Sequence, residues 1–117
     1  MRRDDGVRLR HMLDAAREAR LFASGHTEAE LTTNRMLVLS LVKAIEIVGE
    51  AANRVSEGTQ AQLTAIPWDD IIGMRHRLVH VYFDINLEIL WRTVQDDLPV
   101  LIAALERYLP EQDDLDS

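Results

Sequence analysis

One stretch of ten residues holds most of the side chains in this sequence that could carry chemistry. They are Arg75, His76, Arg77, His80, Tyr82 and Asp84, and apolar residues are interleaved with them. A guanidinium group binds phosphate oxygens through parallel hydrogen bonds, and an imidazole with a pKa of about 6.5 can accept or donate a proton near neutral pH. This combination favours a site for an oxyanion or a phosphate.

The spacing limits which of these groups can meet if the segment is one straight helix. His76 and His80 are four residues apart and would be neighbours on one face. Arg75 and His80 are five apart, roughly 140° around an ideal helix, and would not converge on one small group. Three solutions stay open: the helix loosens near His80, the long arginine wraps around it, or a second copy of the chain supplies the partner group.

Each of these residues also has an ordinary structural explanation. A single arginine on a helix is most often part of a salt bridge, and a single histidine is most often a satisfied structural residue. Tyr82 could be a core aromatic whose hydroxyl reaches the rim. Glu46 lies in the most apolar stretch of the chain and needs a partner if it is buried, so we expect it to pair with Arg75 or Arg77, as structure or as an orienting group.

A metal site is not expected. His76 and His80 have the spacing of two metal ligands on a helix, but the chain has no cysteine and its sequence fixes no third ligand. We therefore predict neither a metal nor a cofactor.

The elements that must position these residues are predicted to be helices. Apolar spacing and helix-ending residues divide the chain into about five helical segments, over residues 4–23, 27–56, 60–65, 68–82 and 87–109. We predict an all-α, up-and-down bundle of four to five helices. Gly25 should end the first helix, and Pro99 should kink the last.

Two helix starts carry capping signals. Thr27 with Glu30 three residues later has the pattern of a capping box, and Asp84 or Asn86 should cap the last helix. The second segment is unusual because residues 36–48 are apolar on nearly every side. A helix of this kind is buried all round. We expect it to be the central helix and also part of a dimer interface.

Length and charge set the class of protein. A chain of 117 residues is one domain, which we place at residues 1–109, followed by an acidic and solvated tail at 110–117. Thirteen basic against twenty acidic residues give a net charge of −7, which argues against non-specific coating of DNA. No apolar run reaches the roughly 20 residues of a membrane span, and the start lacks the pattern of a secretory signal, so we expect a cytoplasmic protein.

The sequence resembles a known family at this point. Arg75, His80 and Tyr82 form an R-x4-H-x-Y string, which is similar to the signature of HepT-like proteins in the HEPN superfamily. Residues 43–52 resemble the second-helix segment of that family, residues 66–75 its lead-in to the motif, and residues 97–99 its last helix. The resemblance covers roughly residues 35–105.

The resemblance implies an HEPN-like homodimer, with a possible higher oligomer, whose two motifs face each other in a cleft. Such proteins are toxins of type II-like or type VII toxin–antitoxin pairs and act as metal-independent endoribonucleases on RNA. Their partner is an MntA-type nucleotidyltransferase antitoxin, which adds AMP to the motif tyrosine.

Carried over by position, Arg75 and His80 are the catalytic pair and Tyr82 is the residue that receives AMP. Supporting roles would fall to His76, Arg77, Glu46 and Asp84. The family commonly has asparagine or another small polar residue after the motif arginine, whereas this chain has His76.

Two other functions fit the same residues. The chain could be a non-catalytic interaction subunit that binds a nucleotidyltransferase and uses the arginine and histidine cluster to hold nucleotide phosphates. It could also be a structural bundle in which pairs such as Arg75 with Glu46 only hold helices together. Replacing both Arg75 and His80 with alanine separates these hypotheses, since only a structural role predicts a large loss of stability.

Overall fold

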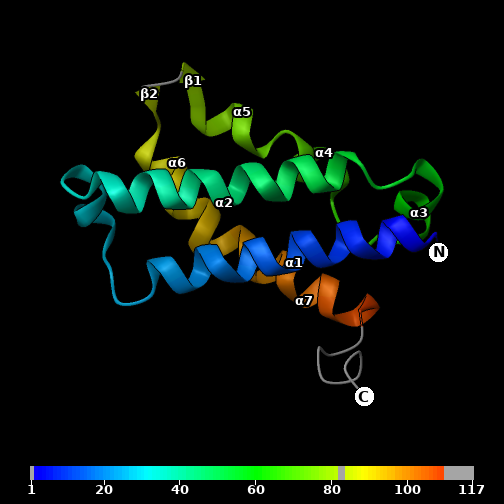
Figure 1. Cartoon of the computed structure of the whole chain (residues 1–117). Helices are drawn as coiled ribbons and strands as arrows, with labels where there is room; N and C mark the ends of the chain where they lie inside the picture. The colour runs from blue at the N-terminus through cyan, green and yellow to red at the C-terminus, as the bar shows by residue number, and fades with distance from the viewer. Residues whose placement is uncertain (1, 82–83, 110–117) are drawn as a thin grey trace.

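The computed structural model describes residues 2–81 and 84–109, and the side chains of residues 79–81 lie outside that description. Two long antiparallel helices form its centre, α1 (Arg3–Ala23) and α2 (Arg35–Asn53). Helix α7 (Leu98–Tyr108) packs on α1, and the short helices α4 (Trp68–Ile72) and α5 (Met74–Leu78) pack on α2 (Figure 1). The remaining elements are α3 (Glu57–Gln62) and α6 (Leu87–Arg92). The all-α bundle predicted from the sequence is confirmed.

The core between these helices is almost entirely aliphatic. Its largest fully buried side chains come from α1, from α2 and from the second half of the chain, and include Leu9, Met12, Leu13, Leu41, Ile45, Ile66, Met74, Leu78, Leu98, Leu101 and Leu105. Small residues of α1 such as Ala15, Ala16 and Ala19 are also buried and let the helices approach closely. The core therefore lies on both sides of α1, against α2 and against α7.

The first predicted helix is confirmed, whereas the second is not continuous. Gly25 follows α1 with a φ of +81°, the left-handed conformation expected of it. The predicted helix over 27–56 is instead a short 3-10 helix, η1 (Glu28–Thr32), followed by α2. Asn34 separates them, since its backbone is not helical and its Oδ1 accepts a hydrogen bond from the Leu37 N–H at 3.0 Å. An asparagine in this position starts a new helix rather than continuing the old one.

The second helix is also not buried on every side within one chain. Met36 is 81% exposed and Leu39 is 46% exposed, so the single chain does not bury these two residues, and their burial in a dimer interface stays a prediction. Inward-facing residues such as Leu41 and Ile45 are fully buried. Helix α2 is therefore central but keeps an apolar outer edge near its start.

The helix predicted over 68–82 ends early, and this changes the candidate site. Gly73 separates α4 from α5, and α5 ends at Leu78. The chain then becomes extended as β1 (Val79–Val81), which pairs antiparallel with β2 (Asp84–Ile85). The two valines of β1 explain the change, because β-branched residues disfavour a helix and favour an extended chain. The prediction of helix beyond Leu78 is wrong.

The remaining predicted boundaries shift by small amounts. Helix α3 begins three residues earlier than predicted, because Ser56 caps it by accepting a hydrogen bond from the Thr59 N–H at 3.4 Å. Of the two residues predicted to cap the last segment, Asn86 is the cap: its Oδ1 accepts from the Ile89 N–H at 3.0 Å. Asp84 lies in β2 instead.

Pro99 disturbs the last segment through a π-helical turn, η2 (Thr93–Asp97), between α6 and α7. Within it the Leu98 N–H donates to the Thr93 carbonyl, five residues back. In this register the Val94 carbonyl would need an N–H from Pro99, which has none. Arg20 of α1 donates to that carbonyl at 3.3 Å and to the Gln95 side chain at 3.0 Å. A π-helical turn that α1 supports therefore lies directly before Pro99, the residue at which a kink is predicted.

The acidic tail at 110–117 and Tyr82 lie outside the described residues. Within the described part of the chain, no helix combines the length and apolar character that crossing a membrane requires.

Candidate functional site

A shallow groove of about 300 Å³ runs between α2 and the α4–α5 pair. It contains one of the two predicted catalytic residues. Its lining residues come from both walls: Glu46, Gly49, Glu50 and Asn53 from α2, and Ile72, Arg75 and His76 from the other side. Most of these side chains are polar, so the groove suits a polar ligand.

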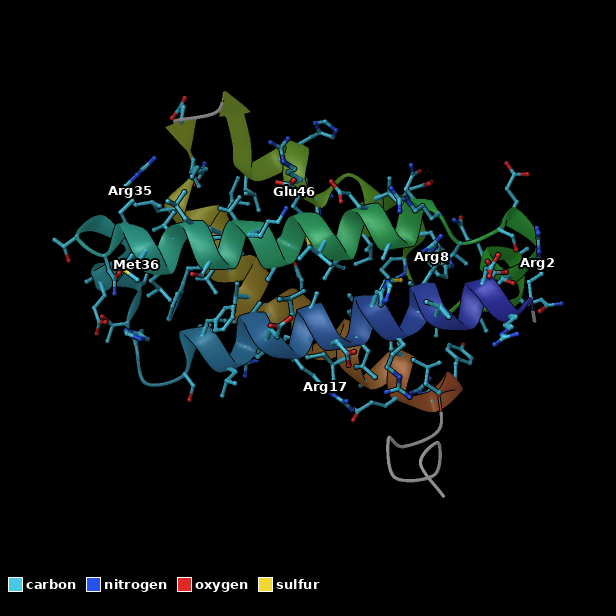
Figure 2. All side chains as sticks on the ribbon, in the orientation of Figure 1. Arg2, Arg8, Arg17, Arg35, Met36 and Glu46 are labelled. Carbon is cyan, nitrogen blue, oxygen red and sulfur yellow. The ribbon has the colours of Figure 1, made fainter. Side chains whose placement is uncertain are left out.

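Arg75 and Glu46 form the central contact of this groove. The Arg75 Nε–H donates to Glu46 Oε2 at 3.2 Å, and Lys43 Nζ lies 3.8 Å from the other carboxylate oxygen of Glu46. Glu46 is 28% exposed and Arg75 is 39% exposed. Figure 2 shows Glu46 on α2 below the segment that carries α5. The predicted pairing of Glu46 with Arg75 is confirmed.

This contact determines what Arg75 can still bind. The Glu46 carboxylate occupies Nε, and neither Nη group of Arg75 has a hydrogen-bond partner among the described residues. The two Nη groups form the part of the guanidinium that binds phosphate or carboxylate in a fork. The ion pair therefore holds the arginine through Nε, and no described residue occupies its anion-binding end.

The other predicted supporting residues are not all brought together. His76 is exposed and lines the groove beside Arg75. Arg77 lines a different pocket on the far side of α5, where its Nη2 donates to the Asp70 carbonyl at 3.1 Å. Asp84 is exposed in β2 and is not among the residues that line the groove. The structure thus places Glu46, Arg75 and His76 in one groove, whereas Arg77 and Asp84 lie outside it.

The backbone of His80 lies in β1, immediately after α5. Because the helix ends at Leu78, the angle of roughly 140° expected on a continuous helix does not apply to Arg75 and His80. Of the three solutions open from the sequence, the backbone adopts the first, in which the helix loosens before His80. The imidazole itself and the motif residue Tyr82 lie outside the described part of the chain.

Sequence reasoning identified Glu46 but assigned no site role to the other polar residues of α2 that border this region. Lys43, Glu46, Glu50 and Asn53 follow one another at steps of three, four and three residues, which places them on one side of a helix. A polar stripe at this spacing in an otherwise apolar helix was the available signal. It marks the face of α2 that α4 and α5 leave partly open.

Among the described residues, the two carboxyl groups with perturbed pKa values lie away from the groove. The hydroxyl of Ser56 and then that of Thr59, each 2.6 Å from Asp5, lower the pKa of the Asp5 carboxyl to about 2. The hydrogen bond from His26 is the main cause that lowers the pKa of Glu30. The Asp5 hydrogen bonds join the start of α1 to α3, and the Glu30 hydrogen bond joins η1 to the turn before it. Within the described residues no group of three His, Asp or Glu side chains is arranged to hold a metal ion.

Comparison with known proteins connects this groove to a family. The family model described as "Ribonuclease HepT-like" matches residues 12–108. The "Putative RNase MJ1380" of Methanocaldococcus jannaschii is 29% identical over 105 residues, which are 90% of this chain and 96% of that protein. The "Probable ribonuclease HepT" of Thermococcus cleftensis is 34% identical over 68 residues, 58% of this chain and 62% of that protein.

A further relative is longer than this chain. The "Gamma-glutamylcyclotransferase and putative RNase MJ0434" of M. jannaschii is 28% identical over 113 residues, 97% of this chain but 51% of that protein. No solved structure matches the chain. The family model spans most of the chain, from the middle of α1 to the end of α7, and includes both walls of the groove. On this evidence the chain belongs to the HepT-like ribonuclease family of the HEPN superfamily.

Proposed function

We propose that this chain is a metal-independent endoribonuclease toxin whose catalytic pair is Arg75 and His80. The observation that carries the proposal is the state of Arg75: Glu46 holds it through Nε, and neither Nη group bonds to a residue that the structure describes. Membership of the HepT-like ribonuclease family supports RNA as the substrate.

The reaction needs no metal. His80 takes the proton of a ribose 2′-hydroxyl, and the 2′-oxygen forms a bond to the adjacent phosphorus. The bond from phosphorus to the 5′-oxygen of the next nucleotide breaks, and that oxygen takes up a proton. The products are a 2′,3′-cyclic phosphate end and a 5′-hydroxyl end. Arg75 stabilises the negative charge that develops on the phosphate oxygens in the transition state.

Glu46 is a positioning residue in this scheme. An arginine side chain has many rotamers, and an ion pair to its Nε removes most of them. Lys43 on the far side of Glu46 adds positive charge near the same groove. Glu46 therefore orients the guanidinium without touching the RNA.

A second copy of the chain would complete the site. The leaving 5′-oxygen needs a proton donor, which would be the partner's His80, with His76 of the same chain as the alternative. A homodimer would also bring two copies of Arg75 into one cleft, so that a protein of net charge −7 could hold RNA locally. The exposed Met36 and Leu39 on α2 supply apolar surface for such contacts.

Control of the activity would come from a nucleotidyltransferase antitoxin of the MntA type. The Tyr82 hydroxyl oxygen would attack the α-phosphorus of ATP, pyrophosphate would leave, and the tyrosine would lose its proton. The AMP group would add bulk and negative charge two residues from His80, and so repel RNA phosphate. This places the chain in a type II-like or type VII toxin–antitoxin pair.

RNA cleavage in EDTA tests this function. We expect the wild-type chain to cut RNA to cyclic-phosphate ends and to leave an otherwise identical strand intact when it has 2′-deoxyribose at the cut site. Arg75→Ala should lower the rate about 100- to 1,000-fold, the usual effect of removing a group that stabilises transition-state charge. His80→Ala should abolish cleavage, and neither change should alter the melting temperature by more than a few degrees.

Three results would contradict the proposal. Equal cleavage of the 2′-deoxy strand would exclude attack by the 2′-hydroxyl. A dimeric chain with unmodified Tyr82 that cuts no RNA would instead support a non-catalytic interaction subunit, for which the exposed apolar edge of α2 is the favouring observation. A large loss of stability in Arg75→Ala would support a structural role for the ion pair.

A further inference from the structure

A second and larger pocket, of about 420 Å³, lies on the other side of α5 from the Arg75 groove. It opens between α4–α5 on one wall and α6, η2 and α7 on the other. Its floor is apolar and buried, formed by Ile71, Met74 and Leu101, while Ile89 is half-buried beside them. The volume is that of a site for a small organic group rather than an ion.

Charged side chains of both signs surround the mouth of this pocket. Arg77 and Arg92 supply guanidinium groups, and Asp70 and Asp97 supply carboxylates, so the four formal charges cancel. Such a rim does not favour a phosphate. It favours a flat, uncharged group that carries both hydrogen-bond donors and acceptors.

The partners of these four side chains show which of them are available. Arg77 donates to the Asp70 carbonyl and lies 3.7 Å from the Asp70 carboxylate, and Arg92 donates to Glu88 at 2.9 Å. The carboxylate of Asp97 has no hydrogen bond or ion pair with any residue that the structure describes. Each arginine has N–H groups beyond those bonds, since a guanidinium has five. Asp97 therefore offers free acceptors, and the two arginines offer free donors.

A nucleobase has the shape and the polar edges that such a pocket would recognise. Bases of single-stranded RNA insert between apolar side chains, stack on guanidinium planes and are read along their edges. Among the four bases, guanine carries two adjacent donors, N1–H and the N2 amino group, which suit one carboxylate. It also carries O6 and N7, the acceptor pair that arginine binds.

We propose that the pocket between α4–α5 and α6–α7 binds an unpaired guanine, with Asp97 accepting from the Watson–Crick edge and Arg77 or Arg92 donating to O6 and N7. The role of this base as part of the substrate depends on the proposed ribonuclease function. Arg75 and Arg77 are two residues apart on α5 and project to opposite sides of it. RNA that crosses the outer edge of this helix would put a phosphate at Arg75 and a neighbouring base in the pocket.

Titration with a mononucleotide tests the pocket without any need for cleavage. Guanosine 5′-monophosphate should shift the amide NMR signals of residues that line the pocket, such as Ile71, Met74 and Ile89. Adenosine 5′-monophosphate lacks the paired donors and should bind at least five-fold more weakly. Asp97→Asn should remove that preference, because an amide cannot accept both N–H groups through two oxygens.

Asp96→Asn is the matched control. Asp96 precedes Asp97, is also exposed, and does not line the pocket, so this variant should keep the guanine preference. Equal binding of the two nucleotides, or an unchanged preference in Asp97→Asn, would overturn the proposal. Shifts of the same signals that depend on protein concentration without nucleotide would also overturn it, because they would make the pocket a protein contact.

Cleavage separates this inference from the proposed function. RNA strands with one guanosine moved stepwise along a uniform sequence should be cut at a constant distance from that guanosine, and Asp97→Asn should lose this phasing. Cleavage without guanine binding would support the proposed ribonuclease function and contradict the proposed guanine pocket. Guanine binding without cleavage would support the guanine pocket and contradict the ribonuclease function.

Discussion

The α1–α2 pair and the segment from α4 to β2 are built in opposite ways. Helices α1 and α2 have 21 and 19 residues and contribute about half of the buried core side chains. The elements from α4 to β2 have five, five, three and two residues, and they carry Arg75, Arg77 and the backbone of His80. The long helices supply stability, and the short elements place chemical groups on both sides of α5. In this protein the two tasks belong to different parts of the chain.

The largest effect on stability should come from the core of the long pair. Leu41 of α2 is fully buried, and Leu41→Ala should lower the free energy of unfolding by about 3 kcal/mol through lost burial and the cavity left behind. Denaturant unfolding measures this. RNA cleavage per folded molecule should stay near the wild-type rate at a temperature where the variant is folded.

Leu39→Ala is the control, because Leu39 lies two residues earlier on the same helix and is 46% exposed. Its effect on the unfolding free energy of the isolated chain should be within roughly 0.5 kcal/mol. Equal effects at the two positions would mean that the outer edge of α2 is buried in the protein in solution, and would point to a dimer interface there.

A change at Glu46, which lies on α2 and contacts Arg75 of α5, should lower the rate of RNA cleavage but leave stability almost unchanged. Glu46→Gln keeps the size of the side chain but removes the charge that holds Arg75. We expect kcat for RNA cleavage to fall about 10-fold with KM nearly unchanged, because the loss concerns the orientation of the guanidinium in the transition state. The melting temperature should change little, as partly exposed ion pairs contribute little to stability.

Glu18→Gln serves as its control, since Glu18 is exposed on α1 and does not line the Arg75 groove. Glu46→Asp should restore part of the rate if the carboxylate orients Arg75. A rise in KM with unchanged kcat in Glu46→Gln would argue instead that Glu46 affects RNA binding.

The smallest effect concerns a contact that joins the start of α1 to α3. Asp5 accepts hydrogen bonds from the Ser56 N–H at 3.0 Å and from the hydroxyls of Ser56 and Thr59 at 2.6 Å. These bonds lower its pKa to about 2, from an ordinary value of 3.8. The ionised form therefore stabilises the fold above about pH 4, and this contribution is lost as the pH falls through the folded-state pKa toward 2.

Asp5→Asn should lower the melting temperature at pH 7 by roughly 5 °C, and the difference from wild type should shrink between pH 4 and pH 2. Thermal melts followed by circular dichroism measure both effects. Asp4→Asn is the neighbouring control, because Asp4 is exposed in the same first turn and should change the melting temperature by at most a degree or two. A pH-independent difference for Asp5→Asn would exclude ionisation of this group as its cause.

Local signals predicted the fold better than they predicted the site. The apolar spacing of α1 and the glycine at position 25 correctly predicted that helix and its end. The capping-box pattern of Thr27 and Glu30 predicted a helix start seven residues before the true cap of α2, Asn34. Local signals also carried the motif helix through to Tyr82, although two valines around His80 already favoured an extended chain.

The sequence alone determined the all-α class, the course of α1, and the R-x4-H-x-Y string that led to the family, since helix spacing and a short motif depend on residues close together in the chain. Only the tertiary structure decided that Glu46 pairs with Arg75, that Arg77 faces another pocket, and that Asp5 binds Ser56 and Thr59. The contacts of Glu46 and Asp5 join residues that are 29 to 54 positions apart, and the sequence pattern leaves several partners open for each of them. The choice among those partners depends on how the helices pack, because a side chain pairs with the group that packing brings within hydrogen-bond distance.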